Sequence, residues 1–223
     1  MLKVCVPVIE TTVEKAVKAV KEAGRVADFI EVRLDYLKKP DASPLLKNRL
    51  RPLIATLRRS DEGGRFKGDE KKRIGLLRDL VDQHVEYVDA ELRSDKTLLL
   101  DLIRNKRKTR VILSYHDFDE TPSMKKLEDI FDRMMEFRPS VIKIATMARS
   151  WEDNLKVMSL IPYAVKNNQS IVAFCMGDIG RMSRIFSPLM GAAWTYAALS
   201  EKQASAPGQM TVARMKEIWE RLR

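Results

Sequence analysis

The sequence contains few of the residues that hold metals or form disulfides. Its 223 residues include only two cysteines, Cys5 and Cys175, and two histidines, and neither CxxC nor HxxxH occurs. Structural zinc sites are built from such closely spaced ligands, so we expect no metal site. Both cysteines fall inside apolar segments, where a buried thiol is the simplest interpretation and no disulfide framework is implied.

Long apolar runs are absent as well. No run approaches the roughly 20 residues that a membrane-spanning helix needs, so we expect no membrane partner. The first residues, Met1-Leu2-Lys3-Val4-Cys5, move directly into a strand pattern and lack the three regions of a signal peptide. A cytoplasmic location is therefore the default expectation.

Aromatic residues make up only 7% of the chain, although its net charge is +10. The basic residues occur in short pieces, such as 49–51, 71–73 and 104–110, that are not interleaved with stacking aromatics. We expect no nucleic-acid partner, because a solvated basic surface, or a field that attracts an anionic substrate, explains the charge more simply. A basic RNA-binding or scaffold protein is the non-enzyme alternative, and it predicts salt-dependent binding that survives Lys143→Ala.

Two kinds of segment alternate along the whole chain. Strands are expected where β-branched and apolar residues gather, at 2–9, 29–34, 52–57, 86–92, 110–115, 141–145, 170–175 and 193–198. Helices are expected where apolar residues have helical spacing, at 11–24, shortly after Pro40-Asp41, and at 71–84, 96–105, 124–137, 151–161, 185–189 and 211–222. Pro162 is expected to end the helix that begins at 151.

Eight strand–helix units without a linker predict an α/β fold, a single-domain (β/α)₈ TIM barrel over residues 1–223. The alternative is a doubly wound open sheet, but the first strand–helix turn lacks its glycine fingerprint. A barrel carries its active site on the loops that follow the strands. The polar loops after the third strand and at 202–208 are therefore candidate site loops.

One lysine interrupts an apolar strand, in Val141-Ile142-Lys143-Ile144-Ala145. A strand covered on both faces is normally a continuous aliphatic run. Burial lowers the pKa of a lysine, and a neutral amine attacks ketones, so Lys143 is a candidate for Schiff-base formation. The alternative is a lysine at the outer edge of the strand whose amine reaches water.

Charged residues also occupy the ends of other expected strands. Glu31, Arg33 and Asp35 alternate, so they share one face of the second strand. They either point into the mouth of the barrel or form an internally satisfied network. Arg58 ends the third strand, and Glu62 follows it in a glycine-containing loop.

The next strands carry further polar residues. Asp89 and Glu91 repeat the alternation on the fourth strand, as partners of a site or as members of a barrel network. His116 ends the fifth strand, one strand before Lys143, and is a candidate general acid–base. A structural histidine is the alternative. His84 falls within an amphipathic helix and is interpreted as a structural or surface residue.

The segment 176–184 after the seventh strand has features of an anion site. Gly177 and Gly180 allow a tight turn, and the segment presents Arg181 and Arg184. An arginine can bind a carboxylate or phosphate through two parallel hydrogen bonds.

Six motifs occur in one order along nearly the whole chain. They are Glu31-Val32-Arg33-Leu34-Asp35, Thr56-Leu57-Arg58 with Glu62-Gly63-Gly64, Ser114-Tyr115-His116-Asp117-Phe118, Val141-Ile142-Lys143-Ile144-Ala145, Met176-Gly177 with Ser183-Arg184, and Ser205-Ala206-Pro207-Gly208-Gln209. Together they resemble the type I 3-dehydroquinate dehydratases of the shikimate pathway. The resemblance implies a (β/α)₈ barrel without metal or cofactor that is commonly dimeric, so a homodimer is expected.

The resemblance also implies residue roles. Lys143 matches the lysine that forms a Schiff base with the substrate ketone, His116 the general acid–base, and Glu62 the residue that orients the histidine. Arg184 matches the arginine that holds the substrate carboxylate. The residues that match the remaining contacts to ring hydroxyls and carboxylate are Glu31, Arg33, Arg58, Ser205 and Gln209, and looser matches to apolar pocket positions are Phe118 and Met176.

The implied activity is that of a hydro-lyase, a syn elimination of water from 3-dehydroquinate through an iminium that yields 3-dehydroshikimate. The loop 205–209 has the small, polar composition of a lid that closes over such a small-molecule substrate. A class I aldolase on a barrel is the rival enzyme, because it also uses a Schiff-base lysine. The charges at 31, 33 and 35 and the 205–209 loop favour a hydroxylated, carboxylated ring instead.

Overall fold

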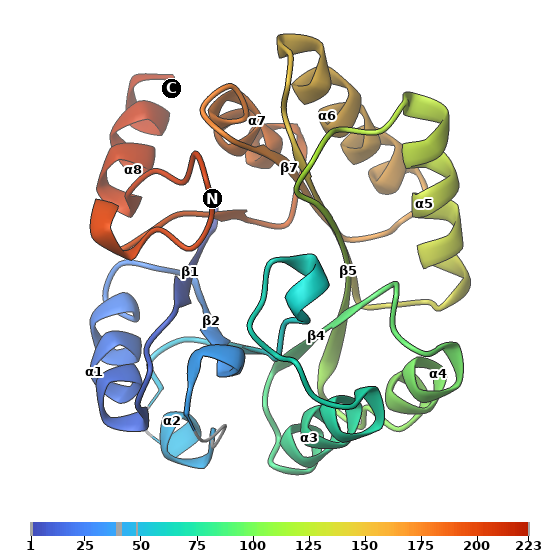
Figure 1. The fold of residues 1–223 in the computed structure, drawn as a ribbon. Helices are drawn as coiled ribbons and strands as arrows, with labels where there is room; N and C mark the ends of the chain where they lie inside the picture. The colour runs from blue at the N-terminus through green and yellow to red at the C-terminus, as the bar shows by residue number, and fades with distance from the viewer. Residues whose placement is uncertain (1, 39–41, 48, 223) are drawn as a thin grey trace.

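Eight parallel strands surrounded by helices form a nearly closed barrel in the computed structural model, which describes residues 2–38, 42–47 and 49–222 (Figure 1). The strands are β1 Val4–Val8, β2 Phe29–Arg33, β3 Leu53–Thr56, β4 Tyr87–Glu91, β5 Arg110–Asp117, β6 Val141–Met147, β7 Ile171–Met176 and β8 Thr195–Tyr196. The α-helices are α1 Val13–Ala23, α2 Ser43–Lys47, α3 Glu70–Asp82, α4 Lys96–Arg104, α5 Met124–Glu136, α6 Trp151–Lys166, α7 Arg181–Phe186 and α8 Val212–Arg221. Short 3₁₀ turns are η1 Leu34–Tyr36, η2 Ser60–Glu62, η3 Ser187–Met190 and η4 Glu201–Gln203.

The order of the strands confirms the predicted barrel. Parallel ladders join neighbouring strands in the order β7-β6-β5-β4-β3-β2-β1-β8. In a doubly wound sheet the strand order would instead reverse at a point inside the sheet. The circle closes where β7 meets β8, and there the Ala193 amide donates to the Ile171 carbonyl at 2.8 Å. No ladder joins these two strands in the described part of the chain.

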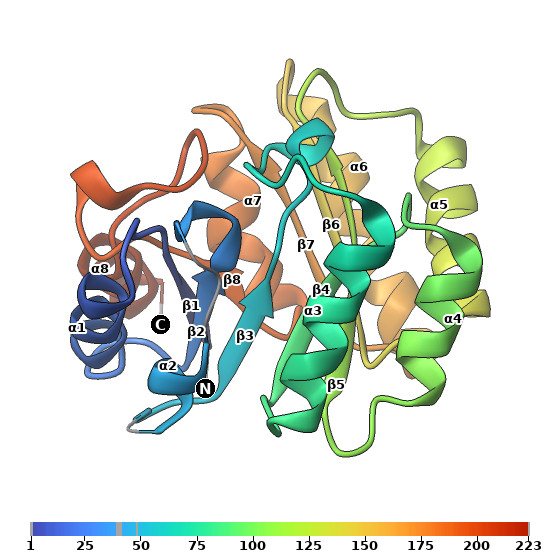
Figure 2. The ribbon, with the colours of Figure 1, turned by 60° about the horizontal axis from the view of Figure 1, so that its bottom comes forward.

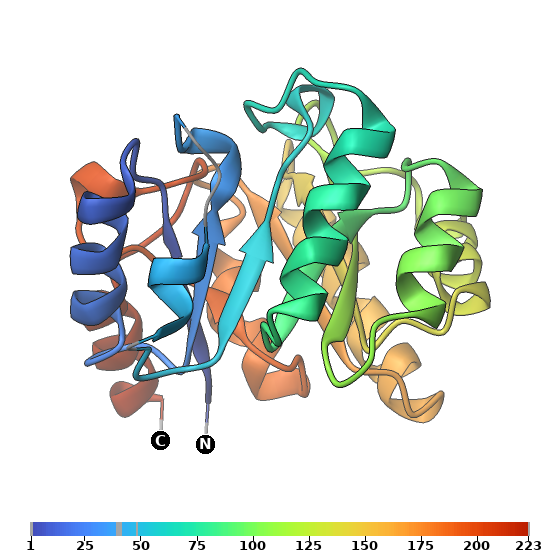
Figure 3. The ribbon, with the colours of Figure 1, turned by 90° about the horizontal axis from the view of Figure 1, so that it is seen from below.

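The two ends of the barrel differ. Figures 2 and 3 show the loop after β3, with η2, standing above the carboxyl ends of the strands. Both chain ends lie at the opposite, amino-end face (Figure 3). In a barrel of this kind the loops at the carboxyl ends hold the functional residues.

The apolar core has two layers. The larger layer lies between the strands and the helices, for example Leu77 of α3 against the sheet. A second cluster fills the inside of the barrel near its amino end, where Phe29, Tyr87 and Trp194 contact one another with ring centroids 4.6–5.9 Å apart. Apolar packing therefore closes the bottom of the barrel, and the same cluster extends to Met176 near the carboxyl end, where polar side chains join it.

Three predicted boundaries were wrong. Helix α6 continues past Pro162 to Lys166, although a proline cannot donate the hydrogen bond that its position in a helix requires. Ile161 and Ala164, on either side of it, are fully buried, so packing outweighs the local cost. The helix expected at 185–189 begins at Arg181, and β8 has two residues rather than six.

Two residues differ in part from expectation. Helix α3 ends at Asp82, and His84 lies beyond it in the left-handed region with φ 61°, but it is exposed to solvent, as the surface interpretation predicted. Arg73, taken as part of the solvated basic surface, is fully buried. Pro40 and Asp41 lie outside the described residues, and α2 follows them as predicted.

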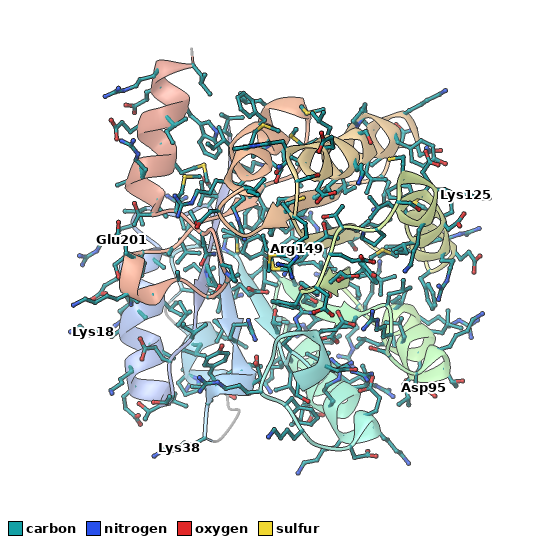
Figure 4. All side chains as sticks on the ribbon, turned by 45° about the horizontal axis from the view of Figure 1, so that its top comes forward. Lys18, Lys38, Asp95, Lys125, Arg149 and Glu201 are labelled. Atoms are coloured by element: carbon teal, nitrogen blue, oxygen red, sulfur yellow. The ribbon has the colours of Figure 1, made fainter. Side chains whose placement is uncertain are left out.

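The charged surface surrounds the barrel. Figure 4 labels charged side chains on the outer helices and loops, with one nearer the centre of the carboxyl-end loops: Lys18, Lys38, Asp95, Lys125 and Glu201 at the periphery and Arg149 near the centre. None of the helices in the described ranges is long and apolar enough to cross a membrane.

Candidate active site

A cavity opens at the carboxyl ends of the strands. It receives side chains from six of the eight strands or the loops that follow them. All nine residues that the resemblance assigned to a site line this one cavity: Glu31, Arg33, Arg58, Glu62, His116, Lys143, Arg184, Ser205 and Gln209. Phe118 and Met176 line it too.

Lys143 lies inside the barrel rather than at its outer edge, with 4% of the residue exposed. Its Nζ atom is 3.1 Å from Oδ2 of Asp89 and 3.3 Å from Oε1 of Glu31. The ring of Tyr196 lies beneath the amine, with its centroid 4.5 Å away. The amine therefore has two carboxylates and one aromatic face as neighbours instead of the apolar surroundings that the strand sequence predicts.

Neighbouring cations keep the Asp89 carboxyl ionised. Burial alone would raise the pKa of Asp89, but the Arg58 guanidinium and the Lys143 ammonium outweigh it and hold that pKa well below its usual range. Oε1 of Glu31 also accepts a hydrogen bond from the Thr56 hydroxyl at 2.8 Å. Two carboxylates are thus fixed beside the amine.

His116 and Glu62 form a buried pair. Nδ1 of His116 is 3.1 Å from Oε2 of Glu62, whose side chain has no solvent exposure. Burial raises the pKa of Glu62 to about 7, with Arg58 opposing the shift. Burial, Arg58 and Lys143 hold the pKa of His116 well below its ordinary value. The imidazole is therefore neutral near pH 7, and Nε2, the nitrogen that Glu62 does not contact, can accept a proton.

Strand register places the histidine and the lysine on the same side of the sheet. Ser114 pairs with Lys143, and His116 pairs with Ala145, across β5 and β6. Residues two apart in a strand share a face, so both functional side chains point into the barrel.

Two glycines bring Glu62 to the histidine. Gly63 has φ 74°, and a Cβ there would lie 2.2 Å from the ring of Phe118. A Cβ on Gly64 would lie 2.1 Å from the Arg58 carbonyl oxygen. The loop after β3 can fold this tightly only without side chains at these positions, which is the signal that Glu62-Gly63-Gly64 carries in the sequence.

The arginines on β2 and after β3 are held by acids. Arg58 donates to Asp89 at 2.8 Å and to Glu91 at 2.9 Å. Arg33 donates two hydrogen bonds to Asp35, at 2.8 and 2.9 Å. Asp35 lies in η1 and does not line the cavity, so only two of the three alternating charges reach it. Both interpretations of that cluster therefore hold in part.

Arg184 differs from these arginines because no acid among the described residues pairs with it. It is fully buried, and Nε and Nη1 have no hydrogen-bond partner among the described residues. Its Nη2 donates to the Pro207 carbonyl at 3.3 Å, and burial lowers the pKa of Arg184 to about 10. A buried cation without a counterion is costly, so this position suits an anionic group of a ligand. Arg181, on the same helix, is exposed and paired with Asp178.

The loop after β8 covers one side of the cavity. Gln209 accepts hydrogen bonds from the Ser205 amide at 2.7 Å and from the Ser205 hydroxyl at 3.3 Å. The Gly177 amide donates to the Pro207 carbonyl at 3.1 Å. A Cβ on Gly208 would lie 2.0 Å from the Gly177 carbonyl oxygen. This loop therefore packs directly on the loop that leads to Arg184.

Tyr196 was not predicted from the sequence as a neighbour of Lys143. The alternation of Trp194 and Tyr196 in a strand was the available signal, because both positions face the inside of the barrel. Among the described residues, no group of three or more histidine, cysteine or acidic side chains is arranged to hold a metal ion.

The barrel and the charged cavity at the carboxyl ends of its strands are together the architecture of a (β/α)₈-barrel enzyme. The family model of type I 3-dehydroquinase matches residues 4–222. The chain belongs to the type I 3-dehydroquinase family.

Individual relatives agree with this membership. The 3-dehydroquinate dehydratase of Methanocaldococcus jannaschii is 37% identical over 218 residues, which is 97% of each chain. That of Thermococcus gammatolerans is 39% identical over 213 residues, 95% of this chain and 94% of the relative. A solved structure of the Clostridium difficile type I enzyme, with covalently modified comenic acid, has a TM-score of 0.90 at 25% identity and covers 99% of this chain and 92% of that one.

Proposed function

We propose that the protein is a 3-dehydroquinate dehydratase, which removes water from 3-dehydroquinate to give 3-dehydroshikimate through an imine on Lys143. One observation carries the proposal: a single cavity contains a lysine between two carboxylates, a His116–Glu62 pair and the unpaired guanidinium of Arg184. Family membership and the names of the relatives support the same activity.

The first step is formation of the imine. The Lys143 amine must lose a proton before it attacks the substrate ketone, and the Glu31 carboxylate, 3.3 Å from Nζ, is within reach of that proton. Water leaves from the carbinolamine, and the resulting iminium withdraws electrons from the neighbouring carbon.

Elimination follows at that carbon. Neutral His116 takes the C–H proton through Nε2, while Glu62 orients the ring through Nδ1. The same histidine then protonates the departing hydroxyl, which leaves as water and forms the conjugated double bond. A second water hydrolyses the imine, releases 3-dehydroshikimate and restores the lysine.

The remaining cavity residues hold the substrate in place. Arg184 binds the substrate carboxylate, because Nε and Nη1 of its buried guanidinium have no hydrogen-bond partner among the described residues. The 205–209 loop closes over the bound substrate. The residues that contact ring hydroxyls and the carboxylate are Glu31, Arg33, Arg58, Ser205 and Gln209, all on the cavity wall.

We further propose a homodimer of single catalytic domains spanning residues 1–223, acting in the cytoplasm. Apolar side chains on the surface of α6 support an interface, because Trp151 and Leu155 are 62% and 59% exposed one helical turn apart.

The activity is tested by incubating the purified protein with 3-dehydroquinate. Dehydration gives a conjugated enone, so absorbance in the ultraviolet should rise with time when the protein is present. Without the protein the absorbance should stay constant. An aldolase would instead split the carbon skeleton. A protein that is folded but produces no enone would overturn the proposal.

We expect Arg184→Met to raise the KM for 3-dehydroquinate and to lower kcat/KM by a factor of about 30 or more, because losing one partner of a buried charge pair costs on the order of 2–5 kcal/mol. Steady-state kinetics measure the effect. Unfolding of the free variant should occur at the wild-type temperature or above it, since the buried cation lacks a counterion. Arg181→Met, on the same helix but exposed, is the matched control. An unchanged KM in Arg184→Met would contradict the role.

A further inference from the structure

Arg73 is a fully buried arginine that does not line the cavity. It lies on α3 at a position that shares the buried face of Leu77 and Leu80. Its guanidinium donates to the carboxylate of Glu91, to the Ser94 hydroxyl at 2.7 Å, and to both carboxylate oxygens of Glu70 on the same helix at 2.8 and 2.9 Å. A cation placed in an apolar helix face is costly, so its retention calls for a specific partner.

Glu91, one of the partners of Arg73, connects it to the active site. Glu91 of β4 has no solvent exposure and lies between two arginines, with Arg73 on Oε2 and Arg58 on Oε1. Arg58 in turn binds Asp89, which binds Lys143. Charges of opposite sign therefore alternate without a break from helix α3 to the amine.

The position of Arg58 depends on this sharing. Glu91 accepts from Arg58 with one carboxylate oxygen and from Arg73 with the other. Asp89 accepts from both Arg58 and Lys143 with the same oxygen, Oδ2. Without Arg73, a buried carboxylate would be left with a single cation, and Arg58 would be drawn toward Glu91. That movement takes its guanidinium away from the cavity wall and from Asp89.

We propose that Arg73 is a positioning residue for the active site, which fixes Arg58 on the cavity wall by holding Glu91 from behind. The kinetic test of this proposal rests on the function proposed above. It assigns a role in catalysis to a residue of the outer helix layer that touches no substrate atom.

The kinetic test compares Arg73→Met with Arg78→Met, a matched change on the same helix at an exposed site paired with Asp101. We expect Arg73→Met to raise KM for 3-dehydroquinate and to lower kcat/KM by on the order of tenfold, as loss of an outer-layer support does. A merely misfolded fraction would lower kcat and leave KM unchanged. Arg78→Met should match the wild type. A wild-type KM in Arg73→Met overturns the proposal.

A second substitution separates charge from packing. Arg73→Met combined with Glu91→Gln removes both charges, while the glutamine oxygen can still accept from Arg58. The double variant should recover part of the lost kcat/KM, and Arg73→Lys should recover part as well. A double variant no better than Arg73→Met alone counts against the proposal, even if both unfold at the same temperature.

A readout without substrate keeps this inference distinct from the proposed activity. The chain has two histidines, so proton NMR can follow His116 with exposed His84 as internal reference. The charged groups facing His116 are Glu62, Arg58, Lys143, Asp89 and Arg33. Displacement of Arg58 should raise the pKa of His116 in Arg73→Met, and the double variant should restore it. An unmoved His116 titration overturns the inference, whereas an inactive wild type overturns only the activity.

Discussion

Lys143→Met is expected to abolish turnover of 3-dehydroquinate, with kcat lower by on the order of 10⁴- to 10⁶-fold, as loss of a covalent nucleophile causes. Methionine has nearly the length of lysine but no amine, so the cavity keeps its volume and loses the atom that joins the substrate. Borohydride reduces an imine to a stable amine. The wild type is therefore mixed with 3-dehydroquinate and reduced with borohydride. Mass spectrometry should then find the peptide containing Lys143 heavier by the mass of the bound, reduced product.

The same experiment on the variant should find no adduct on any residue. Lys125→Met, which changes an exposed lysine of α5, is the control and should be labelled at Lys143 and active like the wild type. An adduct on a residue other than Lys143 in the wild type would refute the assignment. The unfolding temperature of Lys143→Met measures how much the amine stabilises the buried carboxylates of Asp89 and Glu31. We expect the variant to remain folded, because Arg58 still binds Asp89 and Thr56 still binds Glu31.

His116→Ala should separate covalent bond formation from elimination. We expect its kcat to fall by about 10²–10⁴-fold, the usual contribution of a general acid–base. Borohydride should still trap substrate on Lys143, because the amine and its carboxylates remain in place. His84→Ala, which changes the exposed histidine beyond α3, is the control with wild-type kinetics. Turnover at the wild-type rate in His116→Ala, or loss of trapping, would contradict the proposed role.

The pH profile of the wild type adds a second measure of the histidine. The pKa of His116 is depressed, so its base form persists as pH falls through the range where an ordinary histidine becomes protonated. The acid limb of kcat/KM that belongs to His116 should therefore lie below pH 6.5, the ordinary histidine pKa. This limb should be absent from the residual activity of His116→Ala.

The barrel could be predicted because its signal is repeated eight times. Each strand–helix unit is weak evidence, but their number and spacing leave few alternatives. Helix α6 shows the limit of this reasoning, since Pro162 is a strong local stop that is overruled by burial of Ile161 and Ala164. Burial is a property of the folded chain and cannot be read from the proline itself.

The site residues could be named because charges at strand ends are conspicuous among apolar neighbours. The partners of these charges could not. Asp35 follows the alternation of Glu31 and Arg33, but the chain turns into η1 after Arg33 and brings the carboxylate behind the arginine. Arg73 has helical spacing with Leu77 and Leu80, yet a run of basic residues hides it. Its significance depends on Glu91, which is 18 positions away in the sequence.

The incomplete closure between β7 and β8 divides the active site into two mechanical parts. Lys143, His116 and Glu31 project from strands of the continuous ladder, where each strand is braced on both sides. Arg184 follows β7 and the 205–209 loop follows β8, so these groups flank the junction that no ladder spans in the described part of the chain. The proposed bond-making groups therefore stand on the hydrogen-bonded arc of strands, and the groups proposed to hold the substrate stand beside the junction between β7 and β8.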